Sequence, residues 1–209
     1  MDPTPASPDR VDARLVTAVI VTGAMAIAYT ALDVWQPPEP ALSLLAFLPG
    51  VIAVAALTFA GLSRDEIRLR VRPLSRAGAI ALALATLLLL PILGSNSGFV
   101  GWQWLPALVW APASGIAQEL FFRGALLPAL ERVTRSPRWA LVAHGMVFLV
   151  FHLRTYLALP SAGIALVVSC VLFCAGYAWG WQVQRDRTLV WAMAQHSAFL
   201  MLMSLFNFG

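Results

Sequence analysis

Long apolar segments follow one another along this chain, separated by short polar connections. Each segment approaches or exceeds the ~20 residues that a helix needs to cross ~30 Å of hydrocarbon. The pattern predicts about seven membrane-spanning helices, at Leu15–Leu32, Ala41–Leu62, Ala77–Leu93, Trp102–Leu130, Trp139–Leu159, Ala162–Val183 and Leu189–Phe208. We therefore expect an all-α fold, a multi-pass transmembrane helical bundle. It should form a single domain over residues 15–208, after a disordered cytoplasmic N-terminal arm at residues 1–14.

Two of the predicted spans have features of their own. The fourth, Trp102–Leu130, is longer than one crossing requires, so we expect it to tilt, or to break near Pro106 or Pro112. The sixth contains both cysteines of the chain, Cys170 and Cys174, one turn apart. This is not the spacing of paired CxxC metal motifs, and we expect both cysteines to be buried as small packing residues.

The basic residues alternate between connections. All positive charge is arginine, since the chain has no lysine. The arginine-rich connections precede the first span and follow the second, fourth and sixth spans, at residues 10–14, 64–76, 132–138 and 185–187. The intervening connections carry at most Arg154. By the positive-inside rule, this alternation predicts a cytoplasmic N-terminus and an external C-terminus. We expect the protein to lie in the membrane, as an integral protein of a bacterial cytoplasmic (inner) membrane.

Composition supports the lipid bilayer as solvent and excludes another class of partner. Sixty per cent of the 209 residues are apolar and 11% are charged, against about 25% charged residues in an average soluble domain. The net charge of +4 comes from arginines in short connections. They form no basic face interleaved with aromatic residues, so we expect no nucleic acid as partner.

A few ionisable residues lie within the predicted spans. An ionised group near the bilayer centre costs about 2.5–3.5 kcal/mol on insertion scales, so such groups persist where they pair, line a cavity or act chemically. Glu119 and Arg123 are four residues apart, share a helix face and can pair. From this pair alone, a buried ion pair that holds helices together is as good an interpretation as a functional site.

Two histidines strengthen the functional interpretation. By helical rise, Glu119 lies roughly 18 Å from the cytoplasmic end of its span, His152 roughly 21 Å and His196 roughly 14 Å. Three helices should therefore bring a carboxylate and two imidazoles to one layer of the membrane interior. His144 lies two turns before His152 and about 80° around the helix, and we place it near the inner interface.

Several chemistries fit these groups. A carboxylate in a cavity of low dielectric constant can take a proton from water, and an imidazole can hold that water or donate to an oxyanion. Such a set of groups is typical of a hydrolase that uses no covalent nucleophile. The same three side chains could instead bind zinc as two histidines and a glutamate. They could also form a proton relay in a transporter.

The spacing of these residues resembles that of a known family. Gln118-Glu119 followed by Arg123 is similar to the EExxxR motif of the CPBP family of intramembrane proteases, which includes CAAX proteases and bacteriocin-processing enzymes. Phe148 and His152 match the second motif, FxxxH, and His196 matches the first position of the third motif, HxxxN or HxxxD. The order of the motifs and their placement on successive helices also agree, and the CPBP-like core covers about residues 77–208.

The resemblance implies a reaction and a set of roles. In that family, the carboxylates of the first motif and the histidine of FxxxH are thought to activate water for peptide-bond hydrolysis. The third motif is thought to stabilise the oxyanion. Carried to this chain, Glu119 would activate the water, His152 would position it and His196 would donate to the oxyanion. Arg123 would hold the carboxylate.

The chain departs from the family pattern at two positions. Gln118 stands where the first glutamate is usual, and an amide can hydrogen-bond to water but is not a base. Leu200 stands at the asparagine position, and the loss of one oxyanion donor typically costs about 10²–10³ in rate. A catalytically impaired pseudoprotease that binds a membrane peptide or partner protein is therefore the alternative hypothesis. A proton-coupled transporter is a further one, although no inverted repeat is evident.

We expect an intramembrane endopeptidase of glutamic type whose substrate is a membrane-inserted or lipidated protein. The expected catalytic residues are Glu119, His152, His196, Gln118 and Arg123. We expect no cofactor, with zinc as the minor alternative already described. The expected partners are the protein substrate and the lipid bilayer, and the sequence does not indicate an oligomeric state.

Overall fold

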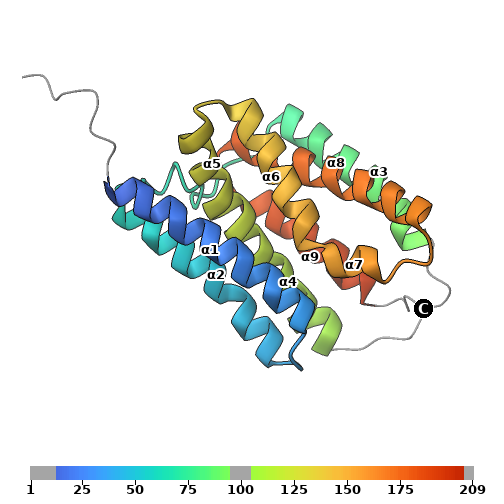
Figure 1. The fold of residues 1–209 in the computed structure, drawn as a ribbon. Helices are drawn as coiled ribbons and strands as arrows, with labels where there is room; N and C mark the ends of the chain where they lie inside the picture. The colour runs from blue at the N-terminus through green and yellow to red at the C-terminus, as the bar shows by residue number, and fades with distance from the viewer. Residues whose placement is uncertain (1–12, 95–104, 205–209) are drawn as a thin grey trace, which may run out of the picture.

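The computed structural model of the protein describes residues 13–94 and 105–204, which form helices joined by short connections, without strands (Figure 1). The fold class is therefore confirmed as an all-α bundle. The first helices are α1 (Ala13–Trp35), α2 (Ala41–Phe59) and α3 (Arg76–Gly94). A continuous run follows, made of η1 (Pro106–Trp110), α4 (Ala111–Glu119), η2 (Leu120–Leu126) and α5 (Leu127–Thr134). The last helices are α6 (Pro137–Phe151), α7 (Leu153–Leu157), α8 (Ala162–Asp186) and α9 (Val190–Met203).

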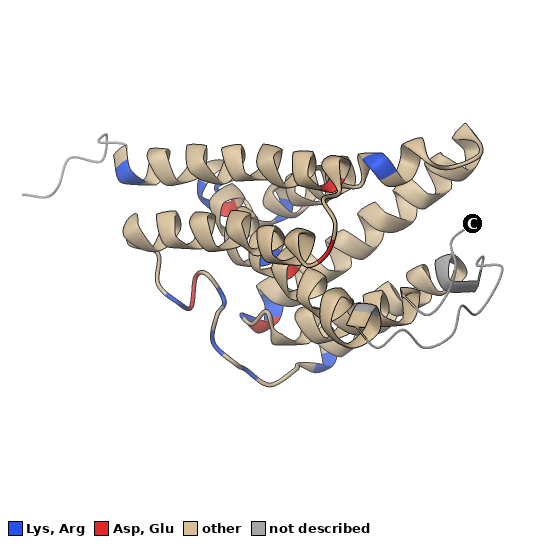
Figure 2. Cartoon of the chain, turned by 90° about the horizontal axis from the view of Figure 1, so that it is seen from below, with Lys and Arg blue, Asp and Glu red and all other residues tan. Residues whose placement is uncertain are grey.

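Every predicted span corresponds to a helical stretch in the described residues. Three helices, α1, α2 and α8, are long and apolar enough to cross a membrane, and α3, α6 and α9 contain shorter apolar stretches. The N-terminal arm predicted at residues 1–14 lies almost wholly outside the described residues. The helices are largely uncharged along their length, while many of the charged residues lie in the connections (Figure 2). This distribution is what a bundle surrounded by lipid requires.

The long fourth segment does not break at Pro112. Pro112 and Pro128 are the second residues of α4 and α5, which directly follow the π-helical stretches η1 and η2. The run instead changes its winding at η1 and η2, which are π-helical. A π-helix bonds i to i+5 and turns fewer degrees per residue than an α-helix. The stretch η2 begins directly after Glu119, so the first motif lies across a change in helical geometry.

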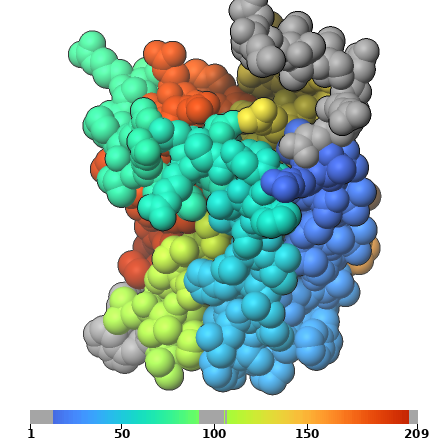
Figure 3. Space-filling view, turned by 90° about the vertical axis from the view of Figure 1, so that its left-hand side faces the viewer, coloured from blue at the N-terminus to red at the C-terminus, as the bar shows by residue number. Residues whose placement is uncertain are grey.

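The bundle is built from pairs of neighbouring helices. The main pairs are α3 with α8, α1 with α2, α4 with α9, and α6 with α8, and α2 also packs against η2. Figure 3 shows the face on which α1 and α2 lie side by side. Glycine permits a close approach at one of these crossings: a Cβ added to Gly50 of α2 would lie 3.2 Å from the backbone nitrogen of Phe121. Small residues at helix crossings are the usual way for membrane helices to pack closely.

The arginine-rich connections meet on one face of the bundle. Arg68, in the connection between α2 and α3, is 1% exposed and donates to both carboxylate oxygens of Glu131 at 2.6 Å. Gln184 of α8 also donates to Glu131, at 2.6 Å, and the backbone N–H of Leu189 donates to the carbonyl of Arg68. Burial lowers the pKa of the Arg68 guanidinium, while the Glu131 carboxylate opposes that shift. The connections after the second, fourth and sixth spans are thus joined, as the arginine alternation requires.

The expected burial of the two cysteines is wrong. Cys170 and Cys174 are both exposed on α8. The face of α8 that packs into the bundle instead carries Leu172, Ala175 and Trp179. In a membrane protein an exposed face contacts lipid and is itself apolar. The apolar character of the segment therefore could not tell which face was buried.

Candidate active site

Glu119 and Arg123 form a fully buried ion pair at the junction of α4 and η2. The Arg123 guanidinium donates to Oε1 of Glu119 at 2.8 Å, and neither side chain is exposed. Arg123 also donates to the carbonyl of Gly176 on α8 at 3.4 Å. A buried charge of either sign is stable only with such compensation. The pair therefore ties the first motif to α8.

His196 completes this cluster from α9. Its Nδ1 lies 2.8 Å from the same Oε1 of Glu119, and the residue is 3% exposed. A carboxylate oxygen can only accept, so Nδ1 of His196 carries the hydrogen. The other carboxylate oxygen of Glu119, Oε2, is buried and has no hydrogen-bond partner within the described residues.

The close approach of α4 and α9 makes the hydrogen bond between Glu119 and His196 possible. Gly115 lies one turn before Glu119, and Ser197 directly follows His196. A Cβ built on Gly115 would lie 2.9 Å from both the nitrogen and the Cα of Ser197. Only glycine fits at this crossing without moving a helix. The absence of a side chain at Gly115 therefore allows Glu119 and His196 to touch.

Aromatic rings enclose the charged groups. The Arg123 guanidinium carbon lies 4.6 Å from the ring centre of Phe148, 5.3 Å from that of Trp179 and 5.8 Å from that of Phe122. Trp179 also stacks on His196, with ring centres 4.7 Å apart. Arginine over an aromatic face gains cation–π attraction, which is larger when water is excluded.

Trp179 is a site residue that sequence reasoning missed. It is 1% exposed, and its indole Nε1 donates to Oε1 of Gln195 at 2.5 Å. Gln195 in turn donates to the carbonyl of Leu82 and to Thr86 on α3. No clear signal in the sequence indicated this role, because Trp179 lies four residues from the end of its predicted span, where tryptophan is usual. A buried indole N–H needs a partner.

His152 lies at the point where α6 gives way to α7 and is half-buried. Its Nδ1 is 2.8 Å from the carbonyl oxygen of Phe148, and its ring centre is 4.6 Å from that of Phe148. A carbonyl accepts only, so Nδ1 donates and the neutral ring keeps its lone pair on Nε2. Phe148 thus contacts His152 and also carries the Arg123 guanidinium, which links the second motif to the first.

Gln118 lies outside this cluster. Its Nε2 donates to Ser114 Oγ at 3.2 Å, and its side chain lines a separate small cavity together with Tyr29 and Asp33. Within the described residues it makes no hydrogen bond to Glu119 or to a histidine. His144 is buried beside Phe122 and is likewise not bonded to the site.

The arrangement does not support the zinc alternative. Across residues 13–94 and 105–204, no group of three histidine, cysteine, aspartate or glutamate side chains is grouped closely enough to hold a metal ion. Glu119 and His196 meet, but His152 is bonded to its own helix. Leu200, at the asparagine position of the third motif, offers no polar group to the site.

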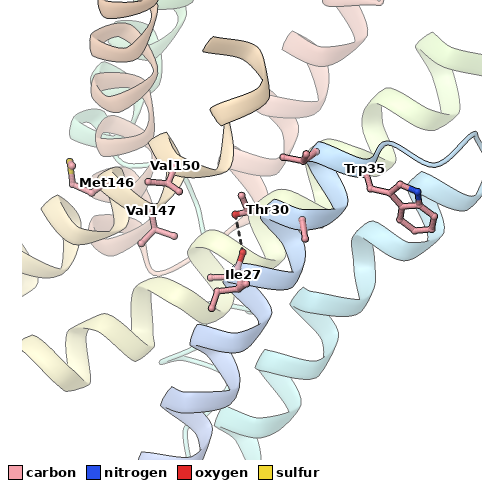
Figure 4. Close-up of a pocket in the computed structure, with 9 residues that line it drawn as sticks. Ile27, Thr30, Trp35, Met146, Val147 and Val150 are labelled. Carbon is pink, nitrogen blue, oxygen red and sulfur yellow. Dashed lines mark hydrogen bonds between the residues drawn. The ribbon is translucent and has the colours of Figure 1, made fainter. Parts of the chain in front are cut away.

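A groove lies on the surface between two helices of the bundle. It has a volume of about 760 Å³ and lies between α1 and α6, lined by nine residues of these helices (Figure 4). Ile27 and Val150 line opposite walls, and Val150 is two residues before His152. Thr30 is the polar residue of the lining, and its hydroxyl is satisfied by the carbonyl of Ala26 at 3.0 Å. The groove is therefore suited to an apolar chain.

The fold and the cluster together define a class: a helical membrane protein whose interior holds a carboxylate bonded to an arginine and a histidine. Comparison with known proteins agrees with this class. Residues 100–202 match the family described as type II CAAX prenyl endopeptidase Rce1-like. The resemblance to the CPBP family is thereby confirmed over residues 100–202.

One curated relative is similar over part of the chain. It is "Uncharacterized protein YyaK" of Bacillus subtilis (strain 168), which is 28% identical over 106 residues. The match covers 50% of this chain and 34% of the relative, so the matched part spans about a third of the relative's length. No solved structure is significantly similar to the chain.

Proposed function

We propose that this protein is an intramembrane endopeptidase of glutamic type, acting on a membrane-inserted or lipidated protein. The observation that carries the proposal is the bonding of Glu119. Its Oε1 accepts from both Arg123 and His196, which leaves Oε2 without a partner in the described structure. The two donors hold the Glu119 carboxylate in a fixed orientation. The second oxygen is then the acceptor for a proton from water.

The hydrolytic step follows from these positions. In the proposed step, a water molecule would lie between Oε2 of Glu119 and the Nε2 lone pair of His152. Glu119 takes one proton while the water oxygen bonds to the carbonyl carbon of the substrate. The carbonyl oxygen becomes an oxyanion, and collapse of this intermediate breaks the C–N bond. The proton held by Glu119 passes to the leaving nitrogen, which restores the carboxylate.

His196 can stabilise the oxyanion only in one protonation state. Its Nδ1–H is already committed to Glu119. Donation from Nε2 therefore requires the imidazolium form. Trp179, stacked on the ring, would hold the imidazolium in place. Arg123 is a positioning residue, because it contacts Glu119 and not the reacting atoms. The expected contact of Gln118 with the water stays a prediction.

The substrate and location follow from the surroundings of the site. The groove between α1 and α6 has apolar walls, and its α6 wall includes Val150, on the same helix run as His152. A lipid anchor or an apolar substrate helix lying there would bring a peptide bond toward the site. We propose the bacterial cytoplasmic membrane as location, with the N-terminus in the cytoplasm and the C-terminus outside, on the arginine alternation.

A comparison of new protein termini in host membranes tests the proposal. Cells would carry wild type, Glu119→Gln, His152→Ala or no copy, with Asp65→Asn as matched control because Asp65 lies in an exposed ion pair in a connection. We expect a defined set of cleavages with wild type and Asp65→Asn that disappears in both site variants. Identical termini in all strains would refute proteolysis.

The alternative, a pseudoprotease that binds a membrane peptide without cutting it, rests on a specific observation. Gln118 replaces a potential base, and its amide is turned into a cavity away from both histidines. This alternative predicts that Glu119→Gln retains the phenotype of wild type, with unchanged termini. The same set of strains therefore distinguishes the two functions.

A further inference from the structure

A second polar site lies beneath the turn between α1 and α2, outside the proposed active site. It is a cavity of about 60 Å³ lined by α1, α2, α4 and α6. Most of its lining residues carry a side-chain oxygen: Tyr29, Asp33, Gln36, Glu39, Ser43, Ser114 and Gln118. The groove between α1 and α6 is by contrast lined by a single such residue. A concentration of oxygen atoms at this point of a membrane bundle calls for a physical explanation.

Two carboxylates stand at the mouth of this cavity without an ion pair in the part of the chain that the structure describes. Glu39 is exposed and Asp33 is half-buried. Ser43 donates to Glu39 from its hydroxyl and backbone N–H, at 2.9 and 3.1 Å, and Gln36 donates to Asp33 at 3.3 Å. Arg154 of α7 acts on Asp33 through its charge only, without a direct bond. The cavity mouth therefore carries two negative charges and few donors.

The floor of the cavity adds two buried oxygens that lack a partner. Tyr29 is 3% exposed and Gln118 is 8% exposed. Neither the Tyr29 hydroxyl nor Oε1 of Gln118 has a hydrogen-bond partner within the described residues. Because Nε2 of Gln118 is committed to Ser114, the amide oxygen is the atom left toward the cavity. A buried polar atom without a partner costs about 1–3 kcal/mol, so a bound species at this point would be stabilising.

We infer that this cavity binds a calcium ion. Ca²⁺ takes six to eight oxygen ligands in flexible geometry, from carboxylates, amide carbonyls and water. Asp33, Glu39 and the amide oxygen of Gln118 supply that chemistry, and the two carboxylates match the charge of a divalent ion. Water alone would satisfy Tyr29 and Gln118, since a polar cavity needs only about 10–15 Å³ to hold one molecule. It would leave Glu39 without a cation and Asp33 with only the charge of Arg154, which is why we favour the cation.

The proposed ion would join α1 and α2 to α4. Asp33 lies in the last turn of α1, Glu39 precedes α2, and Gln118 lies in α4 directly before Glu119. Occupancy should therefore raise the stability of the bundle. The inference goes beyond the proposed proteolysis and does not depend on it, because binding and unfolding can be measured without a substrate.

Calcium binding can be tested on the purified full-length protein in detergent after treatment with a chelator. CaCl₂ should raise the thermal unfolding temperature, and MgCl₂ should do so far less, because Mg²⁺ demands near-ideal octahedral geometry. Terbium, which replaces calcium, should give luminescence on excitation of Tyr29, which lines the cavity, and calcium should quench it by displacement. We expect one ion per chain.

Variants assign the site and can overturn it. Asp33→Asn and Gln118→Leu should each weaken calcium binding about 10- to 100-fold, while the control Asp65→Asn should bind as wild type does. Absence of calcium binding to wild type would mean that the cavity holds water alone. Equal stabilisation by MgCl₂ or by NaCl at matched ionic strength, or equal binding by Asp33→Asn and Asp65→Asn, would also contradict the proposal.

Discussion

Gly115→Ala should separate Glu119 of α4 from His196 of α9 without changing either residue. The added Cβ would lie 2.9 Å from the backbone nitrogen and Cα of Ser197, whereas ordinary contacts are 3.4–4 Å. Helices α4 and α9 must therefore move apart by 0.5–1.1 Å, the difference between those distances. The backbone of Ser197 cannot yield as a flexible side chain would. The added methyl group thus forces α4 and α9 apart one turn from Glu119.

The consequence can be worked out for the Glu119–His196 bond. Its length of 2.8 Å would grow by a similar amount, to about 3.3–3.9 Å, which lies beyond the usual limit of about 3.2 Å. Overpacking of this kind costs about 1–3 kcal/mol, and a hydrogen bond to a charged group is worth about 1.5–3 kcal/mol. A misplacement of about 1 Å at a catalytic group lowers the rate by on the order of 10²-fold.

Cleavage of a substrate identified by its new terminus gives the first assay. We expect Gly115→Ala to lose on the order of 10²-fold in rate. Gly23→Ala is the matched control, because a Cβ at Gly23 of α1 meets nothing within 4 Å. Unfolding free energies give a second, independent readout. If Gly115→Ala acts by breaking the bond to His196, its cost and that of His196→Ala should not add.

Two results would refute this reasoning. Equal cleavage rates for Gly115→Ala and Gly23→Ala would mean that the contact of Glu119 with His196 is not needed for catalysis. If the changes in unfolding free energy caused by Gly115→Ala and His196→Ala add fully, the added methyl group does not act through the Glu119–His196 hydrogen bond.

Two further predictions concern the groove and the arginine-rich face. Ile27→Trp should fill the groove and slow cleavage of a membrane-anchored substrate on the order of tenfold, equivalent to about 1.4 kcal/mol of lost contact. The control Ile20→Trp, seven residues earlier on the same helix and outside the groove, should have no effect. Equal cleavage rates for both variants would exclude the groove as a docking site. Arg68→Ala should lower the unfolding free energy by about 3–5 kcal/mol because it leaves the Glu131 carboxylate without its main partner. Arg70 is 62% exposed in its ion pair, so Arg70→Ala should lower the unfolding free energy by only about 0–1 kcal/mol. Denaturant titration measures both values.

Much of the fold could be predicted from the sequence because its cause is local. A helix that crosses lipid must satisfy all its backbone groups internally and needs about 20 apolar residues. The length of each apolar segment therefore determines that it is a span. The π-helical winding of the fourth span, unlike the presence of the span itself, has no such local cause. Nothing in the composition of Leu120–Leu126 indicated a π-helix, and this stretch packs mainly against α2.

The charged centre of the site was also accessible from the sequence. Ionisable residues are rare enough within a span that Glu119, Arg123 and His196 stood out, and the cost of burying their charges implied that they should pair. Trp179 carried no comparable signal, because a tryptophan in an apolar helix looks like a packing residue. Its contact with His196 exists only because α8 and α9 lie side by side in the folded bundle.

The sequence by itself determined which segments span the membrane, in what order, and which ionisable groups lie between them. Only the tertiary structure decided which face of each helix turns inward. It directs Glu119 to His196 and Gln118, about 100° around the helix, into another cavity, and it leaves Cys170 and Cys174 exposed. The physical reason is that lipid is as apolar as the protein core, so hydropathy does not distinguish the two faces of a span. The rotation of each helix is decided by close contacts such as that of Gly115 with Ser197, which exist only once the helices have met.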